Sequence, residues 1–141
     1  MIKAVVRLTA FLIAISICSM VSAHIGDTKQ KCIERYGKPV NKVGEITVYE
    51  SGEFRVFATF FDGEADSIGY GRKERNVGLT KSEIKSFLES NGGDKIWVEA
   101  PDKVSWITID AALLALYGEK NGILTISTRG RLERKKEKSS E

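Results

Sequence analysis

The chain has 141 residues, of which 22 are Lys or Arg and 19 are Asp or Glu, and its formal net charge is +3 at neutral pH. This length suits one compact domain or two small units that share a core. Residues 24–128 hold 14 basic and 16 acidic side chains, so this part lacks the basic surface that nucleic-acid binding requires. We therefore expect no nucleic-acid partner.

The first 23 residues have the pattern of a secretory signal peptide. Lys3 and Arg7 precede an apolar run over residues 8–21, and small side chains occupy the −3 and −1 positions of a cleavage site after Ala23. An uncleaved transmembrane anchor is the alternative, but this run has 14 residues and a membrane-spanning helix needs roughly 20. We expect a periplasmic or secreted protein with no integral membrane span after cleavage.

The two cysteines predict no disulfide in the mature chain. Cys18 lies in the signal segment, where a lipoprotein signal is disfavoured because the preceding Ile17 is bulky. Cys32 then remains alone, so the fold must rest on its apolar core and on backbone pairing. A redox role for Cys32 is the alternative, but its place on the apolar stripe of a helix favours a small buried side chain.

Residues 24–71 predict a first unit, one helix followed by a three-stranded antiparallel meander. The helix starts near Thr28 and stops at Gly37, because a Gly just past the last turn is a common helix exit. Strands are predicted over residues 43–49, 54–61 and 64–70.

The strand over residues 54–61 is followed by the clearest hairpin signal in the chain. Asp62 and Gly63 supply the two positive-φ residues of a type I′ turn. Alternation places Val56 on one face of the strand and Phe57 and Phe61 on the other. If the helix covers the first face, Phe57 and Phe61 need another cover: the tail, a partner chain or the second unit.

Residues 78–128 predict a second unit of the same kind. Thr80 and Glu83 form a capping box at its helix start, and this start resembles that of the first unit at an offset of 52 residues. A run over residues 111–117 has a helix as its alternative, since Ala and Leu favour helix. Short strands are predicted over residues 95–100, 105–110, 112–117 and 122–128.

The C-terminal segment, residues 129–141, carries six basic and three acidic side chains and a single apolar one. This composition predicts a disordered charged tail or a frayed helix. The interspersed glutamates disfavour the alternative, a tail that contacts anionic lipid or another polyanion.

The helix and meander signals together resemble those of a group of small exported domains. The residues that carry the resemblance are Gly26, Thr28, Cys32, Tyr36, Gly37, Pro39, Val48, Tyr49, Phe54, Val56, Ala58, Phe60, Asp62 and Gly63. The group includes the SmpA/OmlA outer-membrane assembly lipoproteins and the beta-lactamase inhibitor protein, a tandem pair of such units. The resemblance covers residues 26–70 well and 78–128 loosely. It implies an α+β fold of two α-β-β-β units whose helices pack on a shared antiparallel sheet, and a protein-binding role for the exposed sheet face.

Residue types with catalytic or metal chemistry are few and scattered. His24 is the single histidine, so no second histidine is present to complete a metal site. It is also the expected N-terminus of the mature chain, where an exposed side chain cannot be positioned for triad catalysis. Asp62, Glu64 and Asp66 lack the further ligands of a calcium loop, and a solvated strand face explains them. The glycines fall singly at helix ends and turns, which disfavours a phosphate-binding loop. We expect no enzymatic activity, no metal and no cofactor.

The candidate binding residues are aromatic: Phe57, Phe61, Trp97 and Trp106. The tryptophans either pack in the core of the second unit or form a platform for a glycan or a peptide. The leading hypothesis is a non-enzymatic domain that binds another protein through a sheet face or edge. The alternative is a small-ligand or glycan site in a cleft between the two units, lined by Trp97, Trp106 and Tyr70.

Overall fold

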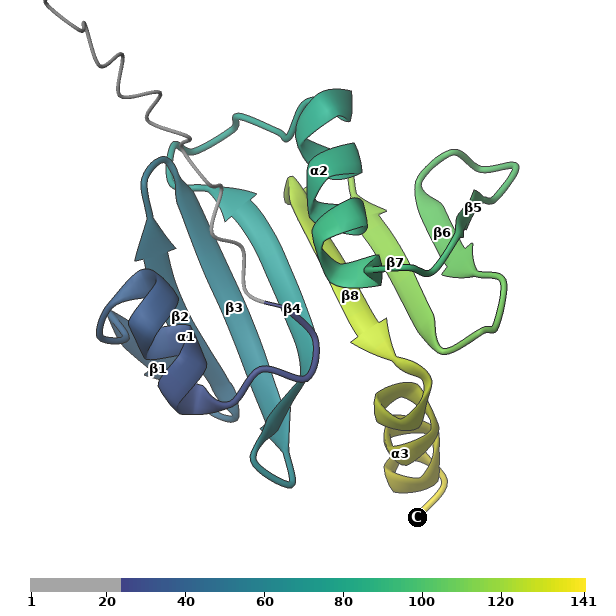
Figure 1. Cartoon of the computed structure of the whole chain (residues 1–141), viewed down its shortest axis with the longest axis horizontal. Helices are drawn as coiled ribbons and strands as arrows, with labels where there is room; N and C mark the ends of the chain where they lie inside the picture. The colour runs from purple at the N-terminus through teal and green to yellow at the C-terminus, as the bar shows by residue number, and fades with distance from the viewer. Residues whose placement is uncertain (1–23) are drawn as a thin grey trace, which may run out of the picture.

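The computed structural model describes residues 24–141, and the predicted signal peptide, residues 1–23, lies outside the described residues. The described chain contains three helices and a single antiparallel sheet of eight strands, an α+β fold (Figure 1). The elements are α1 (Lys29–Tyr36), β1 (Asn41–Val43), β2 (Ile46–Ser51), β3 (Phe54–Phe61), β4 (Glu64–Arg72), α2 (Lys81–Gly92), β5 (Trp97–Glu99), β6 (Ser105–Thr108), β7 (Leu113–Gly118), β8 (Ile123–Thr128) and α3 (Arg129–Ser139).

The strand order across the sheet is β1-β2-β3-β4-β8-β7-β6-β5. The chain therefore builds the sheet from both edges inward, and the last strands of its two halves, β4 and β8, pair at the centre. In this pairing Ile68 lies opposite Ile126 and Tyr70 opposite Leu124, and all four side chains are buried. The central seam thus joins the two halves through core residues.

The first helix, α1, begins and ends as the sequence predicts. The Thr28 hydroxyl accepts a hydrogen bond from the Lys31 amide at 3.2 Å, and Gly37 closes the helix with φ at 84°. Cys32 is the buried residue of this helix, and the Tyr36 ring lies 5.7 Å from that of Tyr49 in β2. These contacts hold α1 against β2.

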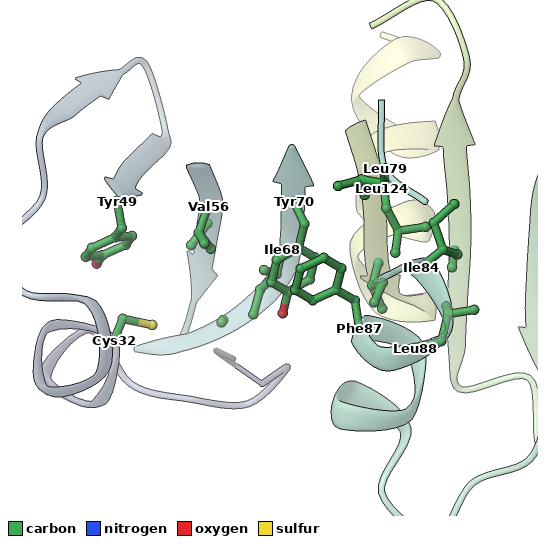
Figure 2. Packing of buried hydrophobic residues seen from close by; sticks show 14 residues of the cluster. Cys32, Tyr49, Val56, Ile68, Tyr70, Leu79, Ile84, Phe87, Leu88 and Leu124 are labelled. Carbon is green, nitrogen blue, oxygen red and sulfur yellow. The ribbon is translucent and has the colours of Figure 1, made fainter. Parts of the chain in front are cut away.

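The second helix, α2, packs on the same face of the sheet as α1 (Figure 1). The predicted capping box is confirmed, since Thr80 and Glu83 exchange hydrogen bonds at its start. Phe87 stacks on Tyr70 of β4 with the ring centroids 4.1 Å apart and an interplanar angle of 8°. One core therefore runs from α1 to α2 under both helices (Figure 2).

The predicted hairpin turn between β3 and β4 is confirmed, with positive φ at both Asp62 and Gly63. The first half nevertheless has four strands and not the three predicted, and the strand that the sequence prediction missed is β1 (Asn41–Val43). All three residues of β1 are exposed, so burial imposes no alternation on them and the sequence carries no strand signal there. In the second half most of the run over residues 111–117 lies in strand β7 (Leu113–Gly118), and the helical alternative is wrong.

Candidate functional site

The face of the sheet opposite α1 and α2 is here termed the open face. Antiparallel partners point to the same side of a sheet and successive residues to opposite sides. Tyr49, Val56 and Tyr70 pair across β2, β3 and β4 in the core, so Val48 and Phe57 point the other way. By the same registers the open face comprises Asn41, Val43, Ile46, Val48, Glu50, Arg55, Phe57, Thr59, Phe61, Glu64, Ser67, Gly69, Gly71, Val98, Ser105, Ile107, Leu114, Leu116, Gly118, Ile123, Thr125 and Ser127.

The half of the open face formed by β5, β6 and β7 carries exposed aliphatic side chains. Leu116 is 57% exposed and Val98 47%, although both lie within strands. Val98 pairs with Ile107, and Ile107 pairs with Leu114, so the apolar side chains form a ladder across the strands. The aliphatic patch consists of Val98, Ile107, Leu114 and Leu116. It can contact another apolar surface.

At the centre of the sheet two glycines let larger side chains lie across the backbone. A Cβ atom at Gly69 would approach Ile123 Cγ2 to 3.3 Å, and one at Gly71 would approach Ile123 Cγ1 to 3.2 Å. Both positions also lie within 4 Å of the Phe57 side chain. Phe57 is therefore half-buried beside Ile123 of β8, so a residue from the second half of the chain covers part of it.

The helix α3 docks at one end of the open face through Asp66. Arg134 donates a hydrogen bond to Asp66 Oδ2 at 2.7 Å, and Arg131 lies 3.7 Å from the same oxygen. The Thr59 hydroxyl donates to Asp66 Oδ1 at 2.6 Å. Asp66 is buried, so the prediction of a solvated strand face is wrong for this carboxylate. Its charge is tolerated because two guanidinium groups and a hydroxyl meet it.

The same helix gives Phe61 a partial cover. The guanidinium carbon of Arg134 lies 3.6 Å from the Phe61 ring centroid, which is a cation–π contact, and yet the side chain remains 49% exposed. Arg131 donates a hydrogen bond to Glu45 at 2.6 Å in the turn between β1 and β2, and this bond lowers the pKa of Glu45. The segment predicted as a disordered tail or a frayed helix thus forms a helix with specific partners.

A cleft of about 1120 Å³ lies between α2 and strands β5 to β7, on the face of the sheet that carries the helices. Trp97 and Trp106 line it together with apolar residues of α2 such as Ile84 and Leu88. Tyr70 does not line it. It is buried in the core against Phe87, and burial raises the pKa of its hydroxyl. The sequence prediction was therefore wrong about Tyr70. It was also wrong about the place of the cleft, because all the lining residues belong to the second half of the chain and none to the first.

The aromatic side chains of the cleft are held in place by hydrogen bonds. The Trp97 indole donates to the Leu88 carbonyl at 2.7 Å, and the Tyr117 hydroxyl accepts from the Leu79 amide at 3.1 Å. Charged side chains also line the cleft: Lys81, Lys85, Glu89, Lys95, Glu99, Asp102, Lys103 and Glu119. The cleft is thus pre-formed and amphipathic.

Cys32 and His24 carry the thiol and the imidazole of residues 24–141. Cys32 is fully buried, as the sequence predicts, and burial raises the pKa of its thiol to about 11. His24 is half-buried, contrary to the exposed end predicted for it, and its amide donates to Asp27 Oδ2 at 3.1 Å. Burial and the Arg35 guanidinium lower the pKa of His24. Over residues 24–141, no three His, Cys, Asp or Glu side chains gather as metal ligands would.

The structure separates the four predicted binding residues into two places. Phe57 and Phe61 lie on the open face, whereas Trp97 and Trp106 line the cleft on the other side of the sheet. Sequence reasoning missed the aliphatic patch because Val98, Ile107 and Leu116 each have an aromatic neighbour, Trp97, Trp106 or Tyr117, so the strands show no clear alternation of apolar and polar residues. The pairing of Arg134 with Asp66 carries no local signal, because 68 positions separate the two residues.

Comparison with known proteins gives no match: no family, no curated protein and no solved structure is significantly similar to the chain. Of the helices described between residues 24 and 141, none has the length and apolar character to span a membrane.

Proposed function

We propose that this protein is a non-enzymatic binding domain whose open face contacts an apolar surface of another protein. The observation that carries the proposal is the aliphatic patch on β5, β6 and β7. Contiguous exposed apolar side chains of this kind mark interaction sites in soluble proteins. The open-face positions of these strands hold no charged residue, and the cores of protein interfaces are depleted of charge in the same way.

The architecture supports this use of the open face. Both core helices pack on the other face, so the patch loses no internal contact when a partner covers it. Leu114 and Leu116 belong to β7, which is hydrogen-bonded on both sides within the sheet, and a partner would therefore meet a rigid surface. A preorganised surface loses little conformational entropy on binding.

The proposal includes the tandem organisation and the kinship with SmpA/OmlA-type domains. Each half contains a helix followed by four strands, and Thr28 and Thr80 cap the two helices in the same way. The offset of 52 residues does not extend to the strands: Phe54 begins the third strand of its half and Trp106 lies in the second strand of the other. The units would thus correspond in their helices and in strand order. The signal-like segment supports export to the periplasm or beyond the cell.

A photocrosslinking experiment tests the proposed interface. A photoreactive amino acid at position 116 is expected to capture a reproducible protein partner from an envelope extract at low salt. The matched control is position 77, because Val77 is also an exposed aliphatic residue but lies outside the strands. Crosslinking that is absent from position 116, or equal at both positions, contradicts the proposal.

The cleft favours a second candidate function, the binding of a small ligand or a glycan. Trp97 and Trp106 are the only tryptophans of the chain, so its intrinsic fluorescence reports directly on the cleft. Titration with a panel of oligosaccharides and small aromatic compounds should give a saturable change that Trp106→Ala removes. A panel without any saturable response rules out this candidate for the compounds tested.

A further inference from the structure

We infer that the partner of the open face is an acidic protein, and that α3 supplies the cationic part of the contact surface. This inference rests on the proposed function above and adds the chemistry of the partner. Two features carry it: the exposed apolar side chains of the open face, and a row of unneutralised cations at the end of that face.

The cations form a stripe along one side of α3. Arg131, Arg134, Lys135 and Lys138 follow the spacing i, i+3, i+4 and i+7, which places them on one helix face. This basic stripe faces the sheet, because Arg131 and Arg134 both form ion pairs with Asp66. Lys135 and Lys138 continue it, and both act with Arg131 to lower the pKa of Glu45 beside β2.

The charge on α3 exceeds what the fold neutralises. The helix contains six basic and two acidic residues. Arg129 pairs with Glu133, and Asp66 and Glu45 meet the two arginines of the stripe. Within the described residues, Lys135, Lys136 and Lys138 form no ion pair. An anionic group brought to this end of the open face would therefore gain free cations without breaking an existing bond.

Apolar side chains accompany these cations on the same face. Val43 and Ile46, on either side of the turn that holds Glu45, are exposed, and so is Phe61 beneath Arg134. The surface that a partner meets is thus apolar across β5 to β7 and positive at the border formed by α3, while the charged open-face residues Glu50, Arg55 and Glu64 lie on β2, β3 and β4. A complementary partner has an apolar centre and carboxylates at the matching edge.

The distribution of side chains favours an acidic protein over an anionic membrane. Proteins that lie in a membrane interface anchor themselves with Trp and Tyr beside their basic residues. Both tryptophans line the cleft on the opposite face. Of the two phenylalanines of the open face, Phe57 is half-buried and Phe61 lies beneath Arg134, and strands β5 to β7 present aliphatic side chains. A second copy of the chain is also disfavoured, because it would bring another basic helix of the same sign to the interface.

The test uses three fluorescein-labelled peptides that share an alternating Val-Thr core and differ in their flanks of Glu, Gln or Lys. Fluorescence anisotropy should show the Glu peptide binding about tenfold more tightly than the Gln peptide at low salt, and the Lys peptide binding most weakly. About 0.5 M NaCl should remove this preference, because it screens exposed charges. The double variant Lys135→Gln/Lys138→Gln should lose the preference for Glu, whereas the control Lys31→Gln/Lys38→Gln, outside the stripe, should keep it.

Leu116→Ser separates the two proposals, because it should weaken the binding of all three peptides to the same extent. If it does so while the preference for Glu is absent or survives the lysine substitutions, the acidic-partner inference is overturned and the proposed function stands. If none of the peptides binds the wild-type protein, both are overturned. Binding to phosphatidylglycerol-containing vesicles that depends on Lys135 and Lys138 and displaces the Glu peptide would instead assign the stripe to a membrane.

Discussion

Asn91 ties three parts of the fold together from within α2. Its side-chain oxygen accepts a hydrogen bond from the Ile25 amide at 3.0 Å, and its nitrogen donates to the Tyr70 hydroxyl at 2.9 Å and to the Phe87 carbonyl at 2.8 Å. The residue is buried, so these partners have little access to water if it is removed. Asn91 thus joins the N-terminal segment, the central strand β4 and α2.

We expect Asn91→Ala to lower the free energy of unfolding by about 1–3 kcal/mol, because it leaves buried donors and acceptors without partners. Chemical denaturation monitored by circular dichroism measures the change. Ser82→Ala, at an exposed position of the same helix, is the control and should change stability by less than about 0.5 kcal/mol. Equal effects of the two substitutions would show that the Asn91 hydrogen bonds contribute nothing measurable.

Cys32 should be inert toward thiol reagents in the native protein. With its pKa raised to about 11, only about one thiol in a thousand is ionised at pH 8, and the side chain is fully buried. Labelling with Ellman's reagent should therefore be slow until guanidinium unfolds the chain, and then rapid. Fast labelling of the folded protein would show that α1 opens locally.

His24 should make stability decrease as the pH falls below neutrality. Burial and Arg35 lower its pKa from 6.5, so the unfolded chain binds a proton more readily than the folded one. The contribution of neutral His24 to the free energy of unfolding is complete above pH 6.5 and is lost as the pH decreases through the pKa of His24 in the folded protein. Thermal unfolding at pH 7.5 and pH 5.5 should show this decrease, and His24→Gln should reduce it. An unchanged slope in the variant would assign the dependence to other groups.

At the scale of elements, α3 differs from the other two helices because charge rather than apolar burial holds it. None of its residues is buried, whereas α1 buries Cys32 and α2 buries Phe87 and its neighbours. Its hold on the sheet depends on Asp66. Because Asp66 is buried, its charge-assisted hydrogen bond from Arg134 is screened by salt less than an exposed ion pair would be.

Asp66→Asn should release α3 while the rest of the fold stays intact. The substitution removes the negative charge that pairs with Arg131 and Arg134 but keeps an oxygen for the Thr59 hydroxyl. The free energy that holds α3 on the sheet should fall by about 1.5–3 kcal/mol. Hydrogen exchange should show faster exchange over Arg129–Ser139 than in the wild type. Glu133→Gln, which breaks only the exposed pair with Arg129, should leave the docking unchanged. Unaltered exchange in Asp66→Asn would mean that other contacts hold α3.

At the scale of the whole molecule, both halves of the chain share one core. Phe87 of α2 stacks on Tyr70 of β4 and meets Phe54 of β3 edge-on at 5.3 Å, so a helix of the second half packs on strands of the first. Pairing of β4 with β8 adds backbone hydrogen bonds between the halves. The two halves should therefore not unfold independently.

Phe87→Ala should destabilise the entire domain by about 3–5 kcal/mol, because it removes a large buried ring from the junction. Tryptophan fluorescence reports on the second half, which contains Trp97 and Trp106, and hydrogen exchange of β2 and β3 reports on the first. In the wild type and the variant, the denaturant midpoints of the two probes should coincide. Separate midpoints would show that the halves are independent folding units.

The sequence alone determined the features that depend on neighbouring residues. The helix starts and the hairpin turn were predictable, because the interactions that form them join residues only a few positions apart. The residues that carry these signals are Thr28, Thr80 and the pair Asp62-Gly63. The face assignment of Phe57 and Phe61 followed from alternation alone. The short strand β1 was not predictable, since three exposed residues carry no burial pattern.

Only the tertiary structure decided how distant segments meet. The pairing of β4 with β8, the burial of Asp66 by Arg134 and the place of Tyr70 in the core all join residues far apart in the chain. Their partners are set by the order of strands across the sheet, which local propensity does not encode. The candidate site shows the same division: alternation marks which side chains leave the core, but the topology decides that β5 to β7 carry an exposed aliphatic patch while α3 covers the other end of the face.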